Sequence, residues 1–305
     1  MAIIVNTNMT ALKTQKNLTN ATNSLNDALE RMSTGYKVNR AADDAAGLYV
    51  ATGLNTQIRG SQVAKNNIAT GNNVLQTLEG DLDVILDNLN RIRDLATQAA
   101  NSIYDDSAMK AMQDEVTARL DEIDRISGAS NFNGLTLLDG QSKLATEGLR
   151  LQVGANSEAA TNSITIDKAM FNRIDSTTLG TNGDDPTADP GTTAITDASL
   201  RDNVEAAFAF ASAAARYITV VDNAIDTIST NKATIGAVMN RLESAETSIV
   251  TTIENNTAAK STIMDADIAE ESANYTKAQI LQQTSSALLI QANALPQIAI
   301  QLVQG

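Results

Sequence analysis

Tryptophan, cysteine and histidine are all absent from this 305-residue sequence. Without histidine or cysteine, the chain cannot form a Ser-His-Asp triad, a cysteine nucleophile, a histidine-ligated zinc site or a disulfide bond. Aromatic residues make up only 3% of the chain, although aromatic side chains supply much of the area buried in globular cores. Alanine, leucine, isoleucine and valine must therefore build the core, which favours helix-on-helix packing. The composition indicates a structural protein, not an enzyme, and we expect no catalytic, cofactor or metal site.

Positive charge is also scarce, because 22 basic residues face 36 acidic ones and the formal net charge is −14. Nucleic acids and anionic membranes bind basic surfaces, so we expect neither as a partner. The sequence has no run of about 18 apolar residues of the kind that spans a bilayer. Its first basic residue is Lys13, which does not fit the charged start of a cleavable signal peptide. If the protein is exported, we expect it to leave by another route.

Proline occurs only at Pro186, Pro190 and Pro296, so the first 185 residues lack the strongest helix breaker. Pro186 and Pro190 lie in the segment 176–199, which is rich in threonine, glycine and aspartate and poor in apolar residues. We interpret this segment as a short surface loop. It separates two halves that both carry helical patterns.

Apolar residues recur at heptad spacing in both halves. In the N-terminal half, the residues that repeat every seven are Ile68, Leu75, Leu82, Leu89, Ala96 and Ile103, and the intermediate ones are Ala64, Leu78, Ile85, Ile92 and Ala99. This spacing predicts a long helix over 64–103 packed in coiled-coil fashion, a break near 101–106 and a second helix over 109–126. A similar pattern over 218–253 is interrupted by Lys232 and Glu246, and such polar residues commonly fix the register of a seam. We predict a mainly α fold, an elongated helical bundle.

The segment 131–168 has a different pattern. Asn133-Gly134 and Asp139-Gly140 are turn dipeptides. Leu149, Leu151 and Val153 alternate with polar residues, as do Ile164 and Ile166. These features predict a small β-hairpin region beside the helices.

Both ends of the chain carry a narrow apolar stripe on an otherwise polar helix. The leucines and methionine that we assign to self-assembly repeat every seven residues: Leu18, Leu25 and Met32 at the start, and Leu281, Leu288, Leu295 and Leu302 at the finish. Alanines lie between them, at Ala21 and Ala28 and at Ala278, Ala292 and Ala299. A helix cannot bury such a stripe alone, so the ends must pair within one chain or with other chains. Their remaining faces are polar but weakly charged, and such faces pack against neighbours with little desolvation of charge.

Several longer motifs resemble those of one known family. Residues 29–39 (LERMSTGYKVN), 41–47 (AADDAAG), 90–96 (NRIRDLA), 120–127 (LDEIDRIS), 131–134 (NFNG) and 152–156 (QVGAN) are similar to the N-terminal region of bacterial flagellins. Residues 278–283 (AQILQQ) and 291–297 (QANALPQ) resemble the C-terminal region of the same family. The resemblance covers roughly the first 170 and the last 100 residues, with the motifs in family order.

The resemblance implies an architecture and a function. Residues 1–42 with 264–305 would form a terminal coiled-coil inner domain, and residues 43–175 with 200–263 a helical bundle with a β-hairpin. The segment 176–199 would be a short variable surface loop in place of the family's large outer domain. Such a chain would polymerise into the flagellar filament for swimming, after export in an unfolded state through the flagellar type III apparatus. Its expected location is outside the bacterial cell.

Partners also follow from the resemblance. They are other copies of the chain in a helical homopolymer, an export chaperone, and the cap and hook-junction proteins. The animal innate sensor Toll-like receptor 5 reads an arginine, a leucine and a glutamate in many flagellins. Matched by motif, these are Arg91, Leu95 and Glu115 in this sequence. Leu95 also lies beside the heptad seam, where packing against a neighbouring subunit is the alternative interpretation.

Two other functions stay open from the sequence. The first is the hook–filament junction protein, a relative with the same ends that is present in few copies. The second is an enzyme that uses paired carboxylates such as Asp43-Asp44, although adjacent side chains on a helix point about 100° apart. Helix capping or subunit contact is the alternative role for this pair. Asp184, Asp185 and Asp189 lie near the prolines and could bind Ca²⁺, but their spacing fits no EF-hand and lacks the closing glutamate.

Overall fold

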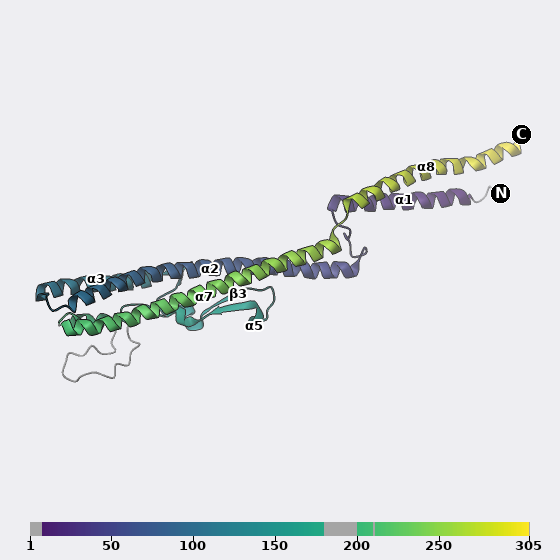
Figure 1. Cartoon of the computed structure of the whole chain (residues 1–305). Helices are drawn as coiled ribbons and strands as arrows, with labels where there is room; N and C mark the ends of the chain where they lie inside the picture. Colours follow the sequence, from purple (N-terminus) through teal and green to yellow (C-terminus); the bar gives the residue numbers. More distant parts are fainter. Residues whose placement is uncertain (1–7, 180–199, 210, 305) are drawn as a thin grey trace. The chain divides into compact units, whose positions relative to one another are not determined.

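The chain forms two compact units, Met1–Ile58 with Ile253–Gly305 (unit 1) and Arg59–Thr252 (unit 2). The structure, a computed structural model, describes residues 8–179, 200–209 and 211–304, and leaves out the side chains of 159–160 and 295–304. Helices dominate both units, and the strands are short (Figure 1). The mainly α fold with a small β-hairpin region is confirmed. The domain boundaries at 42/43 and 263/264 stay predictions.

Unit 1 is built around two helices from opposite ends of the chain, α1 (Met9–Thr34) and α8 (Ile268–Gln304), which lie side by side (Figure 1). The side chain of Asn8 caps the start of α1 by accepting a hydrogen bond from the Ala11 N–H at 3.0 Å. Gly35 ends the helix in the left-handed region, with φ 74°, a conformation that glycine adopts without a Cβ penalty. Its N–H donates to the Arg31 carbonyl at 2.8 Å.

The connections on either side of this helix pair are tied to each other. The Lys37 N–H donates to the Met264 carbonyl at 2.7 Å, and the Ala266 N–H donates to the Gly35 carbonyl at 2.9 Å. Asp43 accepts hydrogen bonds from the Arg40 and Asn39 N–H groups at 2.9 and 3.0 Å, and these bonds lower the pKa of its carboxyl.

The neighbouring Asp44 caps the start of helix α2 (Ala45–Ala99), where it accepts a hydrogen bond from the Gly47 N–H at 2.8 Å. The capping role predicted for the Asp43-Asp44 pair is thus confirmed for Asp44.

Unit 2 packs α2 with α3 (Asp106–Ala129) and α7 (Ala211–Met264) through the predicted heptad seams. The fully buried seam residues of α2 and α7 include Ile68, Leu75, Leu82, Leu89, Val221, Ile228, Ile235 and Leu242. Ile103 does not extend the seam as predicted. The helix ends at Ala99 and Ile103 lies exposed in the turn before α3.

The two polar interruptions of the seam form ion pairs with α2. Lys232 pairs with Asp83, and Glu246 pairs with Lys65 at 3.8 Å. Arg93 and Asp222 add a third pair between α2 and α7 at 2.5 Å. Residues early in α7 thus pair with residues late in α2, so the two helices run antiparallel. The ion pairs therefore link α2 and α7 along the seam.

Two antiparallel hairpins follow α3. The strands β1 (Asn131–Phe132) and β2 (Leu135–Thr136) pair around Asn133-Gly134, both at positive φ, as the predicted two-residue turn requires. Helix α4 (Lys143–Glu147) precedes β3 (Leu149–Gln152), and α5 (Ala159–Asn162) lies between β3 and β4 (Ser163–Ile166). In the second hairpin Leu151 is opposite Ile164.

The second hairpin packs on α2. The Asn67 side chain donates to the Gln152 carbonyl at 3.2 Å. A Cβ added at Gly60 would lie 2.8 Å from the Ala155 Cβ, and one added at Gly71 would lie closer than van der Waals contact to the Leu151 side chain. The hairpin therefore approaches the helix where two glycines, about three turns apart, leave room for it.

After β4, unit 2 continues with η1 (Lys168–Phe171), the turn at 173–179 and α6 (Leu200–Ala207). Burial raises the pKa of Asp175, but hydrogen bonds from the Thr177 and Thr178 hydroxyls and the charge of Arg173 outweigh it and lower the pKa. Tyr217 of α7 is buried and donates its hydroxyl hydrogen to the Leu200 carbonyl at 3.1 Å.

Asp184, Asp185 and Asp189 lie outside the described residues. Within the described ranges, no helix is both long enough and apolar enough to cross a membrane.

Candidate functional site

The seam between α1 and α8 is lined by small residues. Its buried members are Ala21 and Ala28 on α1 and Glu271, Ala278, Ser285 and Ala292 on α8. Each set repeats every seven residues, as coiled-coil packing requires. Because most of these side chains are small, the two helix backbones can approach closely without a thick apolar core.

Polar contacts at three levels fix the register of this seam. Asn8 donates to the Ala292 carbonyl at 2.8 Å, Gln282 donates to the Thr22 hydroxyl at 3.3 Å, and Arg31 pairs with Glu271 at 3.2 Å. The start of α1 therefore lies beside the far part of α8, and the helices run antiparallel. The carboxylate of Glu271 is largely buried, and the Arg31 guanidinium compensates for the removal of its charge from water.

The predicted self-assembly residues occupy two different environments. Leu18, Leu25 and Met32 are half-buried along α1, one helical turn from the buried alanines. Leu281 and Leu288 lie beside the seam of α8 but stay 48% and 55% exposed. The side chains of Leu295 and Leu302 lie outside those described. Within one chain, the small residues of α8 are buried in the seam, whereas Leu281 and Leu288 of the same heptads stay about half exposed.

Further apolar side chains are exposed around α8, and the sequence analysis did not single them out. Ile280 is 57% and Ile290 is 72% exposed. At 100° per residue, these two isoleucines and the leucine pair Leu281 and Leu288 spread over about half of the helix circumference. The signal that would have found them was present in the sequence, because no acidic or basic residue follows Lys277. An apolar face this wide is normally buried against a neighbouring element.

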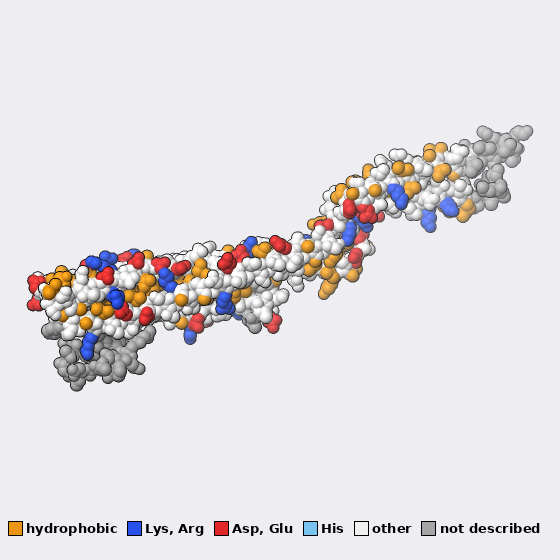
Figure 2. Space-filling view, in the orientation of Figure 1, with side chains coloured by type: hydrophobic (Ala, Val, Ile, Leu, Met, Phe, Trp, Pro, Cys, Tyr) orange, Lys and Arg blue, Asp and Glu red, His pale blue; other side chains and the backbone are white. Residues whose placement is uncertain are grey.

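The start of α1 presents a comparable surface. Met9 and Leu12 are exposed and line a hollow of about 530 Å³ with Lys13, Lys16 and neighbouring polar side chains. Leu29, further along the helix, is exposed too. Figure 2 shows orange hydrophobic side chains at the surface of both α1 and α8. Large exposed apolar patches on a soluble chain mark interaction sites.

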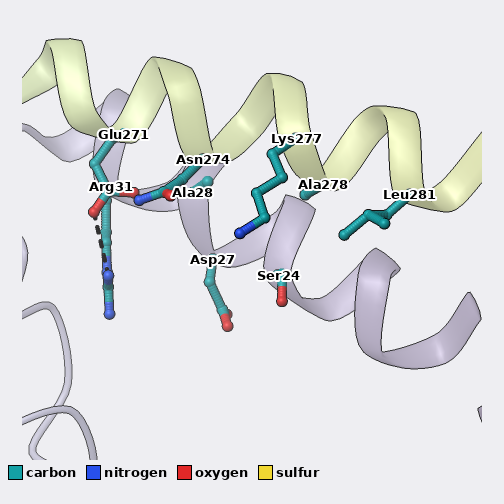
Figure 3. Close-up of a pocket in the computed structure, with 9 residues that line it drawn as sticks. All are labelled: Ser24, Asp27, Ala28, Arg31, Glu271, Asn274, Lys277, Ala278 and Leu281. Carbon is teal, nitrogen blue, oxygen red and sulfur yellow. Dashed lines mark hydrogen bonds and ion pairs between the residues drawn. The ribbon is translucent and has the colours of Figure 1, made fainter. Parts of the chain in front are cut away.

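A groove of about 370 Å³ lies between α1 and α8 near the Arg31–Glu271 pair (Figure 3). Its lining residues are Ser24, Asp27, Ala28, Arg31, Glu271, Asn274, Lys277, Ala278 and Leu281. Asp27 and Lys277 form no ion pair or hydrogen bond with any residue that the structure describes. The groove therefore offers one free carboxylate and one free ammonium group to a partner.

The three residues matched to the receptor-binding pattern are not equally accessible. Arg91 on α2 and Glu115 on α3 form an ion pair at 2.8 Å on the surface of unit 2. The hydrogen bond and charge of Glu115 raise the pKa of the Arg91 guanidinium. Leu95 is 2% exposed, so its own chain covers it and a neighbouring subunit is not needed for its packing.

Comparison with known proteins finds relatives that align with nearly the whole chain. Residues 5–143 match the bacterial flagellin N-terminal helical region, and residues 218–303 match the bacterial flagellin C-terminal helical region. The chain is 37% identical to a flagellin from Bacillus subtilis (strain 168) over 325 residues, which covers 98% of this chain and 99% of the relative. It is 34% identical to a flagellar filament core protein from Brachyspira hyodysenteriae, covering 99% of this chain and all of the relative.

The fold is also found in solved structures. A structure described as a flagellar hook-associated protein from Vibrio parahaemolyticus matches 73% of this chain and 99% of its own length, with a TM-score of 0.53 and 16% identity. That likeness concerns the fold alone. The two helical-region matches and the relatives aligned over nearly their whole lengths leave no large variable domain between the halves. The chain belongs to the bacterial flagellin family.

Proposed function

We propose that this chain is a structural subunit that polymerises into a flagellar filament for swimming, through the exposed apolar faces of α1 and α8. The observation that carries the proposal is the uncharged stretch of α8 after Lys277, which exposes Ile280, Leu281, Leu288 and Ile290. The chain covers only one side of this helix with α1. Other copies would cover the rest.

Burial of these four side chains would contribute to the free energy of polymerisation. Complete burial of a leucine or isoleucine side chain is worth about 1.5–3 kcal/mol. About half of that area is still exposed at Ile280, Leu281, Leu288 and Ile290. Each residue would thus contribute on the order of 1 kcal/mol on assembly, before the entropy cost of fixing a subunit is counted.

The experiment compares two variants that carry the same substitution at similar exposure. Leu288→Asp places a carboxylate on the proposed surface of α8. Leu135→Asp places it on β2 of unit 2, where the leucine is 49% exposed. Purified proteins are concentrated with and without short sheared filaments as seeds and imaged by negative-stain electron microscopy. We expect long filaments from the wild type and from Leu135→Asp, and none from Leu288→Asp.

Circular dichroism supplies the folding control, because both variants should keep the helical signal of unit 2. Normal filaments from folded Leu288→Asp would show that the leucine face does not mediate assembly. The alternative proposal, a hook–filament junction protein, predicts a different result. In that case wild-type monomers would not elongate even on seeds.

Family membership also supports a route and a set of partners. We propose export in an unfolded state through the flagellar type III apparatus, with an export chaperone inside the cell and cap and hook-junction proteins outside. An apolar α8 surface supports a chaperone in particular, because free subunits at high concentration would otherwise associate before export. Deleting the export apparatus should retain the chain inside the cell, and secretion at the normal level would contradict this route.

Recognition by Toll-like receptor 5 is a separate proposal, supported by the exposed pair of Arg91 and Glu115. Because Leu95 is buried, it would not contact the receptor directly. Its role would be to support the position of the surface residues above it. In a receptor reporter assay on monomer, Arg91→Ala should lower the response. Arg125→Ala is a matched control, because Arg125 forms a similar surface ion pair with Glu122 at 2.6 Å. Equal responses from both variants would contradict the proposal.

A further inference from the structure

Two lysines near the start of α1 have no counter-charge in their part of unit 1. Lys13 and Lys16 are exposed, and neither forms an ion pair or hydrogen bond with any described residue. They are the only charged side chains in residues 1–26, and residues 278–305 contain none. The antiparallel register places this part of α1 beside the uncharged part of α8.

The other end of the helix pair is acidic. Residues 27–58 and 253–277 contain nine acidic and five basic side chains, a net charge of −4. Figure 2 shows this segregation, because red side chains lie near the α1–α2 and α7–α8 connections while the charged side chains toward the start of α1 are blue. Unit 1 therefore has a positive and a negative end.

The groove between α1 and α8 lies at the acidic end, and its free carboxylate is on the same face of α1 as the lysines. At 100° per residue, Lys13, Lys16 and Asp27 fall within about 60° of each other around the helix. In Figure 3 the Asp27 side chain points away from α8. The lysines are 11 and 14 residues from Asp27, which is about 16 and 21 Å along the helix at 1.5 Å per residue.

The apolar neighbours of these charges also match. Met9 and Leu12 lie beside the lysines in the hollow on α1, and Leu281 lines the groove. All three are exposed. A contact between the two surfaces would pair charges and bury apolar area at the same time.

We propose that Lys13 and Lys16 of one copy dock at the groove of a neighbouring copy and pair with its Asp27. This inference rests on the proposed function, and it names the partner surface and the residues that set the register. The contact is heterologous, because different surfaces of the two copies meet, and contacts of this kind build open helical assemblies. Neighbouring copies joined in this way are shifted along the helix axis by about 16–21 Å.

Two charge-reversed chains test the proposal in a form that separates it from folding defects. The first is Lys13→Asp/Lys16→Asp, and the second is Asp27→Lys. Each alone brings like charges together at the contact. The critical concentration for seeded growth at low salt should rise about tenfold or more, which corresponds to about 1.4 kcal/mol. The rise should shrink at 1 M salt, where the Debye length is only about 3 Å.

An equimolar mixture of the two variants is the decisive measurement. Each chain then carries the surface that complements the other, so alternating copies should polymerise at close to the wild-type concentration. If the mixture polymerises no better than either variant alone, the lysines and Asp27 do not meet between copies and the proposal is wrong. If wild type itself forms no filaments, the proposed function fails instead.

Lys277, the unpaired lysine of the groove, gives a further control. Lys277 would repel the incoming lysines, so Lys277→Ala should leave the critical concentration unchanged or lower it. A rise as large as that of Asp27→Lys would show that the groove receives an acidic group, which overturns the proposal. A membrane as the occupant is tested with anionic vesicles. Wild-type binding that Lys13→Asp/Lys16→Asp abolishes, together with normal polymerisation of that variant, would also overturn it.

Discussion

Alanine substitution at two glycines of α2 should have opposite effects on the stability of unit 2. Gly80 lies in a helix interior with no atom within 4 Å of an added Cβ. Glycine at such a position costs about 0.5–1 kcal/mol relative to alanine. Gly80→Ala should therefore raise the free energy of unfolding by about that amount.

Gly60→Ala gains the same helix propensity but meets the loop that follows β3. The added Cβ would lie 2.8 Å from the Ala155 Cβ and 3.2 Å from its Cα, closer than ordinary van der Waals contact. Overpacking of this kind typically costs about 1–3 kcal/mol. The loop must shift, and hydrogen bonds from the Gln152 side chain to the Gly154 and Asn156 carbonyls oppose the shift. Gly60→Ala should thus be less stable than Gly80→Ala by about 1–3 kcal/mol.

Urea unfolding of monomeric protein, followed by circular dichroism at low concentration, measures the difference. The comparison of two glycine-to-alanine changes on one helix cancels the propensity term. If Gly60→Ala stabilises the chain as much as Gly80→Ala, the loop at 153–158 does not rest on α2. The argument that glycines admit the second hairpin would then be refuted.

Three further predictions concern unit 2. Leu120→Ala, at a side chain with no exposed area, should lower the free energy of unfolding by about 2–5 kcal/mol, and a loss below that of exposed Leu135→Ala would contradict the assigned core. Tyr217→Phe removes the hydroxyl that donates to the Leu200 carbonyl and should cost about 1–3 kcal/mol in urea unfolding; an unchanged midpoint would show that the bond contributes nothing. The pKa of Asp175 is lowered below its ordinary value of 3.8 in the folded state, so its contribution is complete above pH 3.8 and is lost as the pH falls through the lower folded value. Wild type should lose stability more steeply than Asp175→Asn on acidification below pH 3.8, and parallel curves would refute this.

The helical seams of unit 2 could be predicted from the sequence because their residues repeat with the period of a packed helix. Leu75, Leu82 and Leu89 are large, regularly spaced and fully buried. The prediction was wrong at Ile103, which continues the apolar spacing but lies four residues beyond the helix end at Ala99. Spacing records which side a residue would face if the helix continued, but it does not show where the helix stops.

The polar interruptions were recognised from the sequence without their partners. Lys232 and Glu246 break the apolar pattern, but Asp83 and Lys65 lie far away in the chain. Only the antiparallel packing of α2 and α7 brings these charges together. The docking of the second hairpin at Gly60 and Gly71 is a contact of the same long-range kind.

The sequence by itself determined that both ends are helices with a seven-residue repeat. It also determined that both ends carry motifs of the flagellin family. Tertiary structure decided which stripe of each repeat faces α1. One heptad contains both Ala278 and Leu281, about 60° apart on the helix. Both recur every seven residues, so the spacing does not show which of them faces α1. In the structure Ala278 is buried and Leu281 stays exposed. Close approach of two backbones favours the smaller side chain, so Ala278 packs against α1 and Leu281 stays on the surface that we propose for contacts with neighbouring copies.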